Sequence, residues 1–141
     1  MKKILIALAT VAVLCGCERT EKDGLVEQLR LKFKQDTDLA DYKISPEEMA
    51  ECVADKILKE IPGIPGTPRR NSFIKAYTRL VRVDPREDFR PALEETKEIF
   101  GSVANAHEAA GSIAMSNFSC MGDLINGQPL NESLGSDPIE N

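Results

Sequence analysis

The sequence predicts an all-α fold, a single small bundle of about four helices with one disulfide. Apolar residues recur at steps of three and four in several segments, whereas no convincing run alternates apolar and polar residues as a half-buried strand does. Prolines and glycines gather between these segments. The chain has 141 residues, which suits one domain rather than two.

The first amphipathic helix is expected to begin at Leu25 and to reach about Phe33. Apolar residues recur there at helical spacing, and the residues between them are polar or charged. The stretch 35–43 loses this periodicity and predicts a loop, with Leu39 and Tyr42 as packing anchors. The first helix is therefore expected to be short.

The tetrapeptide Ser45-Pro46-Glu47-Glu48 predicts the start of a second helix that runs to about Glu60. Serine caps, proline fits the first helical position, and the second glutamate completes a capping box. One stripe of this helix is apolar. Its members are Met49, Cys52, Val53 and Ile57.

The stretch 61–70 contains three prolines and cannot continue that helix. Pro65 and Pro68 match a P-x-x-P spacing, which is typical of polyproline ligands. In so short a stretch this spacing is more often a stiff connection between helices, and we adopt that interpretation.

A third helix is expected over about 71–83. Its inward residues are Phe73, Ala76, Tyr77 and Leu80. Asp84-Pro85-Arg86-Glu87 then repeats the pattern of the earlier cap and predicts a new turn. Pro91 interrupts the chain again, so a long helical segment is expected to start near it and to continue toward Cys120.

The long segment carries a regular apolar row that predicts packing against other helices. The row comprises Leu93, Thr96, Phe100, Val103, His107, Ala110 and Ala114. A second row comprises Ile99, Ala106, Ile113 and Cys120. Glycine weakens helices, so a bend is expected at Gly101 or Gly111. Residues 121–141 are polar and acidic and predict a flexible tail.

The first sixteen residues have the pattern of an export signal. Lys2 and Lys3 precede an apolar run from Ile4 to Leu14. A membrane-spanning helix needs about 20 apolar residues, and this run is shorter. We expect residues 1–16 to be a cleaved signal peptide.

The sequence Leu14-Cys15-Gly16-Cys17 resembles the lipobox of bacterial lipoproteins. The resemblance covers only the leader and Cys17, and it implies cleavage before Cys17 and attachment of acyl chains to this residue, which would anchor the protein to a membrane. Residues 17–24 are then the lipidated cysteine and a short tether, and 25–120 the helical domain. In such lipoproteins an aspartate after the cysteine favours the inner membrane. Glu18 stands here, so the expected location is the outer membrane, facing the periplasm.

The chain has 18 Lys and Arg against 23 Asp and Glu, a net charge of −5 that becomes −7 when Lys2 and Lys3 leave with the signal peptide. This balance disfavours a nucleic-acid-binding protein. Lipidation and cleavage would leave Cys52 and Cys120 as the remaining cysteines. In an oxidising compartment two cysteines most simply form one structural disulfide. A redox role is the weaker alternative, because no C-x-x-C motif follows the leader.

Between residues 69 and 90 the charge balance reverses to a local net of +4. The basic members are Arg69, Arg70, Lys75, Arg79, Arg82, Arg86 and Arg90, against three acidic residues. A solvated helix face with intramolecular partners is the simpler interpretation. The functional alternative is a docking patch for an acidic protein surface or for anionic headgroups.

The sequence offers no convergent catalytic set, and we expect neither a catalytic residue nor a cofactor. His107 is the one histidine, and its apolar row predicts a core or helix-interface position. A zinc site needs three or four ligands, and the sequence offers one histidine besides two cysteines that are expected to form a disulfide. An acidic cluster could be proposed for a metal or for glycosidase-like chemistry, but helix N-terminal roles explain it better. The cluster comprises Asp84, Glu87, Asp88, Glu94 and Glu95.

Three functional classes remain in competition. The favoured one is a non-enzymatic, tethered module that binds or helps to assemble another envelope protein, and its size, anchor, helices and disulfide are similar to those of pilotin lipoproteins in architecture only. The second is an immunity protein that neutralises an envelope-attacking toxin. The third, an envelope enzyme, has the weakest support. The sequence leaves the oligomeric state and the partner's identity open.

Overall fold

The computed structural model describes residues 4–84 and 86–127, with side chains from Arg19 onward. In these ranges the secondary structure is entirely helical, which confirms the all-α prediction, and it comprises six helices rather than about four. They are α1 (Ile4–Phe33), α2 (Thr37–Asp41), α3 (Pro46–Glu60), α4 (Pro68–Val81), α5 (Arg90–Phe100) and α6 (Val103–Gly127).

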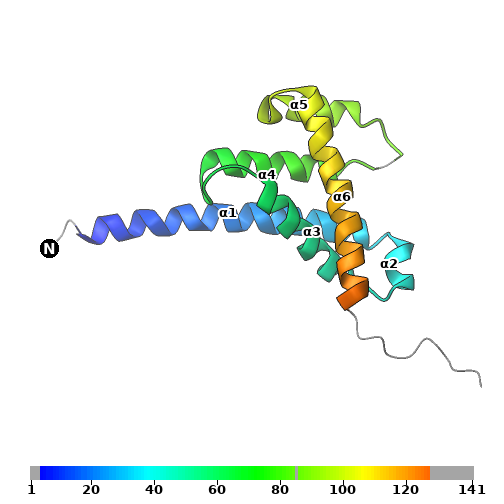
Figure 1. Cartoon of the computed structure of the whole chain (residues 1–141). Helices are drawn as coiled ribbons and strands as arrows, with labels where there is room; N and C mark the ends of the chain where they lie inside the picture. Colours follow the sequence, from blue (N-terminus) through cyan, green and yellow to red (C-terminus); the bar gives the residue numbers. More distant parts are fainter. Residues whose placement is uncertain (1–3, 85, 128–141) are drawn as a thin grey trace, which may run out of the picture.

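Helix α1 is longer than the sequence pattern suggests, because it continues through the segment 17–24 that was expected to be a tether. Within that segment Lys22 bonds to Asp55 of α3 and Glu21 pairs with Lys75 of α4. The N-terminal part of α1 projects beyond the other helices (Figure 1). Among the described residues, no helix has the length and apolarity required to span a membrane.

Two local features explain why there are more helices than expected. The stretch 35–43 holds the short α2, whose N-terminus is capped by the Asp36 carboxylate. Leu39 is buried there as predicted, but Tyr42 is 52% exposed, so its expected role as a packing anchor is wrong. The long C-terminal segment breaks at Gly101, which has φ of 92°, a conformation that glycine adopts without strain.

The predicted start of α3 is confirmed in detail. The Ser45 hydroxyl accepts from the Glu48 amide, and the Glu48 carboxylate accepts from the Ser45 amide. Helix α4 begins at Pro68, three residues earlier than expected, because Thr67 caps it and proline fits its first position. Pro65 thus lies in the connection between α3 and α4, and Pro68 is the first residue of α4.

The second proline motif behaves differently from the first. The Asp84 carboxylate accepts from the Arg86 amide, and the Asp84 carbonyl accepts from the Glu87 amide, which closes a turn. Helix α5 begins only at Arg90, where the Asp88 carboxylate accepts from the Arg90 amide. The motif therefore makes a turn before α5 and does not cap it.

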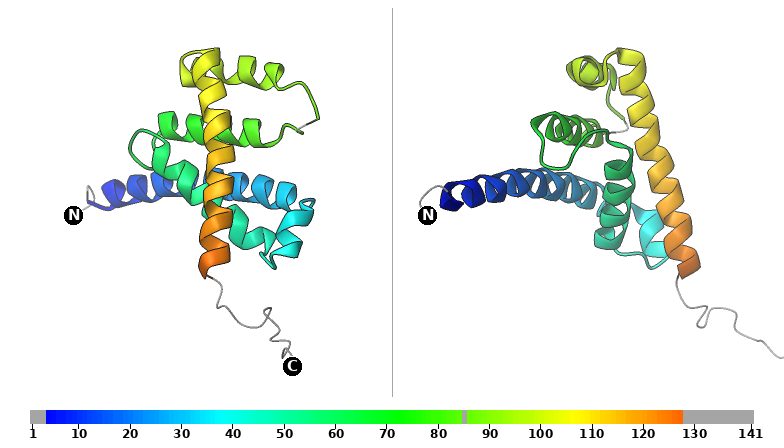
Figure 2. Two further views of the ribbon diagram at one scale, coloured as in Figure 1. Left: turned by 45° about the vertical axis from the view of Figure 1, so that its right-hand side comes forward. Right: turned by 60° about the vertical axis from the view of Figure 1, so that its left-hand side comes forward.

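The helices pack in two groups, one of α1, α3 and α4 and the other of α5 and α6. Helix α1 lies against α3 and α4. Helix α6 crosses the other side of α3 and α4, and α5 lies beside the N-terminal end of α6 (Figure 2). A continuous core fills the space between α1, α3 and α4. It includes Leu25, Leu29, Met49, Val53, Ile57, Ile74 and Leu80.

A disulfide joins Cys52 of α3 to Cys120 of α6, with the two Cα atoms 5.9 Å apart, and this pairing is confirmed. The expected tail begins too early, since α6 continues to Gly127 and Leu124 and Ile125 pack against the core. A helix persists there because the disulfide and these apolar contacts hold it to α3. Residues 128–141 of the expected tail lie outside the described range.

Candidate protein-binding surfaces

The basic segment between residues 69 and 90 is dispersed by the fold. Arg70 is only 9% exposed, and its guanidinium donates to the carbonyls of Ile61 and, at 2.8 Å, Leu58, near the C-terminus of α3. A buried guanidinium that satisfies helix-end carbonyls fixes the connection between α3 and α4. The prediction that Arg70 contributes to a docking surface is therefore wrong.

Four other basic residues have partners within the chain. Lys75 pairs with Glu21 at 3.2 Å, and Arg79 holds Glu95 of α5 with two nitrogens. The remaining pairs are Arg86 with Asp84 and Arg90 with Asp88. Arg69 and Arg82 are exposed. The arrangement favours the simpler interpretation, a solvated face with intramolecular partners.

The same pairs account for most of the acidic cluster. Hydrogen bonds from Arg79 to Glu95, and from Arg86 to Asp84, lower the pKa of these carboxyl groups. Glu94 pairs with Lys97 on the same helix. Within the described part of the chain, no three His, Cys, Asp or Glu residues lie close enough to hold a metal ion.

His107 is exposed on α6, so its expected place in the core is wrong. The break at Gly101 interrupts both rows that were predicted for one long helix. Beyond it the second row points inward, with Ala106, Ala109, Ile113, Ser116 and Cys120 buried. The imidazole of His107 has no hydrogen bond or ion pair with a described residue.

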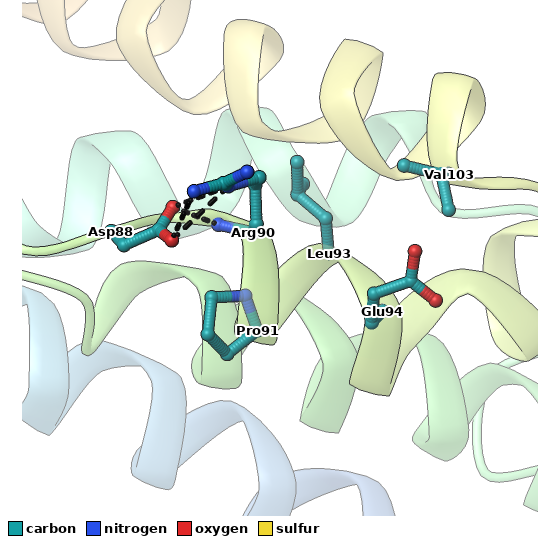
Figure 3. Close-up of a pocket in the computed structure, with 6 residues that line it drawn as sticks. All are labelled: Asp88, Arg90, Pro91, Leu93, Glu94 and Val103. Carbon is teal, nitrogen blue, oxygen red and sulfur yellow. Dashed lines mark hydrogen bonds and ion pairs between the residues drawn. The ribbon is translucent and has the colours of Figure 1, made fainter.

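A shallow depression lies where α5 meets the start of α6 (Figure 3). At its edge Arg90 Nη2 lies 3.0 Å from Asp88 Oδ2, and the two side chains form an ion pair. The apolar wall of the depression comprises Pro91, Leu93 and Val103. The charged groups at this edge already satisfy each other. The depression therefore offers little to a charged ligand.

A second hollow, the aromatic groove, lies between α4 and α6. Its lining comprises Glu60, Pro62, Phe73, Tyr77, Phe100, Asn105, Glu108, Ala109 and Ser112. The Phe100 ring meets Tyr77 and Phe73 edge-on, with centroids 5.3 and 5.7 Å away. The Tyr77 hydroxyl lies 3.5 Å from the Ser112 hydroxyl. Burial is the main cause of the raised pKa of Tyr77, and the negative charge of nearby Glu60 raises it further.

The outward side of α6, which we call the α6 outer face, exposes large apolar side chains. Phe118 is 80% exposed and Met115 69% exposed. Gly111 and Ala114, one turn before them, are also exposed. Helix α6 contains no Lys or Arg. The sequence analysis did not predict this face. Met115 and Phe118 fall outside both predicted buried rows, and this placement of two large apolar residues could have indicated that they are exposed.

The side chain of Cys17 lies outside the described residues, as do residues 1–3 of the expected signal peptide. The expected cleavage point between Gly16 and Cys17 falls within α1. No protein-family model, curated protein or solved structure matches the chain.

Proposed function

We propose that the chain is a lipid-anchored helical module of the bacterial cell envelope that binds another protein and performs no catalysis. The leader pattern and the lipobox-like sequence before Cys17 support the anchor, and Glu18 supports delivery to the outer membrane, facing the periplasm. The Cys52–Cys120 disulfide agrees with an oxidising compartment.

The observation that carries the binding role is the α6 outer face. Exposed apolar side chains that adjoin one another mark interaction sites, and Met115 and Phe118, three residues apart, are neighbours on one side of α6. Met115 and Phe118 supply apolar contact area, and Gly111 and Ala114 permit the close approach of another backbone. The partner proposed for this face is an apolar helix of an envelope protein, as in a pilotin-like assembly role.

Metabolic labelling with palmitate tests the anchor. The protein should incorporate label and fractionate with outer membranes, and Cys17→Ser should abolish both. Cys15→Ser is the matched control, because Leu14 before it does not fit the small-residue position of a lipobox. Label that persists in Cys17→Ser contradicts the anchor.

Site-specific photocrosslinking in intact envelopes tests the binding face. A photoreactive residue in place of Phe118 should give a discrete adduct with one other protein, and the adduct should weaken when Met115→Ser is added. The same residue in place of Glu51, an exposed position on α3, is the control. Adducts equal to those of the control, or adducts with a second copy alone, contradict the proposal. An envelope-attacking toxin as the partner would assign the immunity function instead.

A further inference from the structure

The aromatic groove combines rings with carboxylates in a way that the α6 outer face does not. Phe73 and Phe100 are partly buried, and with Tyr77 they form a cluster whose rings meet at 66° and 88°. Two helices contribute to it, because Phe73 and Tyr77 come from α4, and Phe100 ends α5. Opposite them, α6 presents Asn105, Glu108 and Ser112.

Two exposed carboxylates line this groove, Glu60 from the end of α3 and Glu108 from α6. Neither forms an ion pair with a described residue. Glu60 lies close enough to Tyr77 to raise the pKa of its hydroxyl. Negative charge thus flanks the aromatic cluster from two separate helices, and neither carboxylate is ion-paired with a described cation.

Asn105 adds a polar group at the edge of the groove. Its side-chain nitrogen donates to the Phe100 carbonyl at 2.9 Å, which fixes the amide next to the aromatic cluster. Its Oδ1 accepts no hydrogen bond from a described residue and remains available as an acceptor. The groove therefore offers carboxylate and amide oxygens, and it contributes no charged donor of its own.

We propose that the aromatic groove binds an arginine side chain of a partner protein. Guanidinium groups stack on aromatic rings and donate several hydrogen bonds in one plane, so they match a site that joins rings with carboxylate and amide acceptors. The carboxylates of Glu60 and Glu108 supply the charge, and the rings supply apolar surface for the arginine stem. The inference rests on the proposed protein-binding function and names the chemistry of the partner.

Arg69, on α4, lies next to the groove without lining it. Arg69 precedes Phe73 by four residues on α4, so the two share a side of that helix. Its charge opposes the binding of a second cation at that end of the groove. Arg69→Gln should accordingly leave arginine binding unchanged or strengthen it.

A nuclear magnetic resonance titration of the full lipidated protein in detergent micelles tests the proposal. The probe is the tripeptide acetyl-Gly-Arg-Gly-amide, compared with its citrulline counterpart, which has a similar shape and no charge. The arginine peptide should cause saturable shifts of the Asn105 side-chain amide and the Ser112 backbone amide. The citrulline peptide should bind about tenfold more weakly or not at all.

Substitution of the two carboxylates completes the test. Glu60→Gln with Glu108→Gln should weaken arginine binding about tenfold, whereas Glu51→Gln, an exposed position on α3, should not change it. Unaltered circular dichroism shows that the variants fold. Equal binding of the two peptides, shifts remote from the groove, or insensitivity to the double substitution each overturn the proposal. Saturation by spermidine but not by the arginine peptide also overturns it.

The outcomes separate this inference from the function on which it rests. If photocrosslinking at Phe118 fails and the arginine peptide still occupies the groove, the α6 outer face is wrong and the groove remains. If crosslinking succeeds and the titration fails, the partner binds without an arginine in the groove.

Discussion

The core between α1, α3 and α4 differs sharply from the hairpin formed by α5 and α6. In the first region large aliphatic side chains such as Leu25, Ile57 and Ile74 are completely buried. In the second region the buried side chains are mostly small, such as Ala92, Ala106 and Ser116, while Met115 and Phe118 remain in solvent.

The difference shows how one small domain separates the side chains that stabilise its fold from the large apolar side chains that remain in solvent. Burial of large aliphatic groups stabilises the fold by about 1.5–3 kcal/mol for each side chain, so the core of α1, α3 and α4 carries most of the folding energy. The hairpin gains less from burial and is held by three kinds of link. These links are the disulfide, the edge-on aromatic contacts of Phe100 and the ion pairs Arg79–Glu95 and Lys56–Asp123.

Removal of the disulfide should have the largest effect. The bridge closes a loop with a sequence separation of 68 residues, and the loop-entropy model assigns it about 4 kcal/mol. Urea unfolding of a Cys52→Ala, Cys120→Ala variant should show this loss, and reduction of the unmodified protein should reproduce it. A loss below about 1 kcal/mol would show that packing alone holds α6 in place.

The same substitution in the two regions should differ in cost. Ile57→Ala, at a position with 0% exposure in α3, should lower the free energy of unfolding by about 3–4 kcal/mol. Ile113→Ala, at 6% exposure in α6, should cost about 2 kcal/mol, since small neighbours provide fewer contacts to lose. Equal costs in urea unfolding would contradict the contrast between the core and the hairpin.

Arg70 tests the junction between α3 and α4. Arg70→Met should cost about 2–3 kcal/mol, because the carbonyls of Leu58 and Ile61 lose a donor. Its neighbour Arg69 is exposed, and Arg69→Met should stay within about 0.5 kcal/mol of the unmodified protein. If both variants unfold at the same urea concentration, the buried guanidinium contributes nothing to the junction.

The Arg79–Glu95 pair should give a small, pH-dependent effect. The hydrogen bond from Arg79 lowers the pKa of Glu95 in the folded chain, so its contribution is present above the unfolded pKa and is lost as pH falls through the folded value. Between pH 6 and pH 3 (about the range around a carboxyl pKa) the Tm of the unmodified protein should fall more than that of Glu95→Gln. High salt should reduce this difference in Tm. If the Tm of both proteins falls equally between pH 6 and pH 3 at low salt (about 10 mM), the Arg79–Glu95 pair does not cause the pH dependence.

Phe118 should give the smallest effect on stability. Its ring is 80% exposed, so Phe118→Ser should change the free energy of unfolding by no more than about 0.5 kcal/mol. The same variant should lose the partner proposed for the α6 outer face. A large loss of stability would instead show that the ring contributes to folding.

Local sequence patterns were sufficient for several elements. The Ser45 capping box marks the start of α3, and the stripe through Met49, Val53 and Ile57 is buried as predicted. The disulfide followed from counting cysteines. These predictions hold because a cap and a helical stripe depend on residues only a few positions apart.

Other features depend on contacts between distant residues. The row through His107 was as regular as the row through Ile113, and only the break at Gly101 and the packing of α6 on α3 decided which of them faces inward. Arg70 resembled its basic neighbours in the sequence, yet carbonyls at the end of α3 hold it in the interior. Neither choice can be read from a local pattern.

The helical class, the first cap, the disulfide partners and the excess of negative charge follow from the amino-acid sequence, since each depends on composition or on residues close in the chain. The packing of the helices, in contrast, sets which members of the basic segment form ion pairs, and it brings Phe73, Tyr77 and Phe100 together beside Glu60 and Glu108. The physical reason is that charge pairing and groove formation depend on how helices pack, and packing joins residues that lie far apart in the chain.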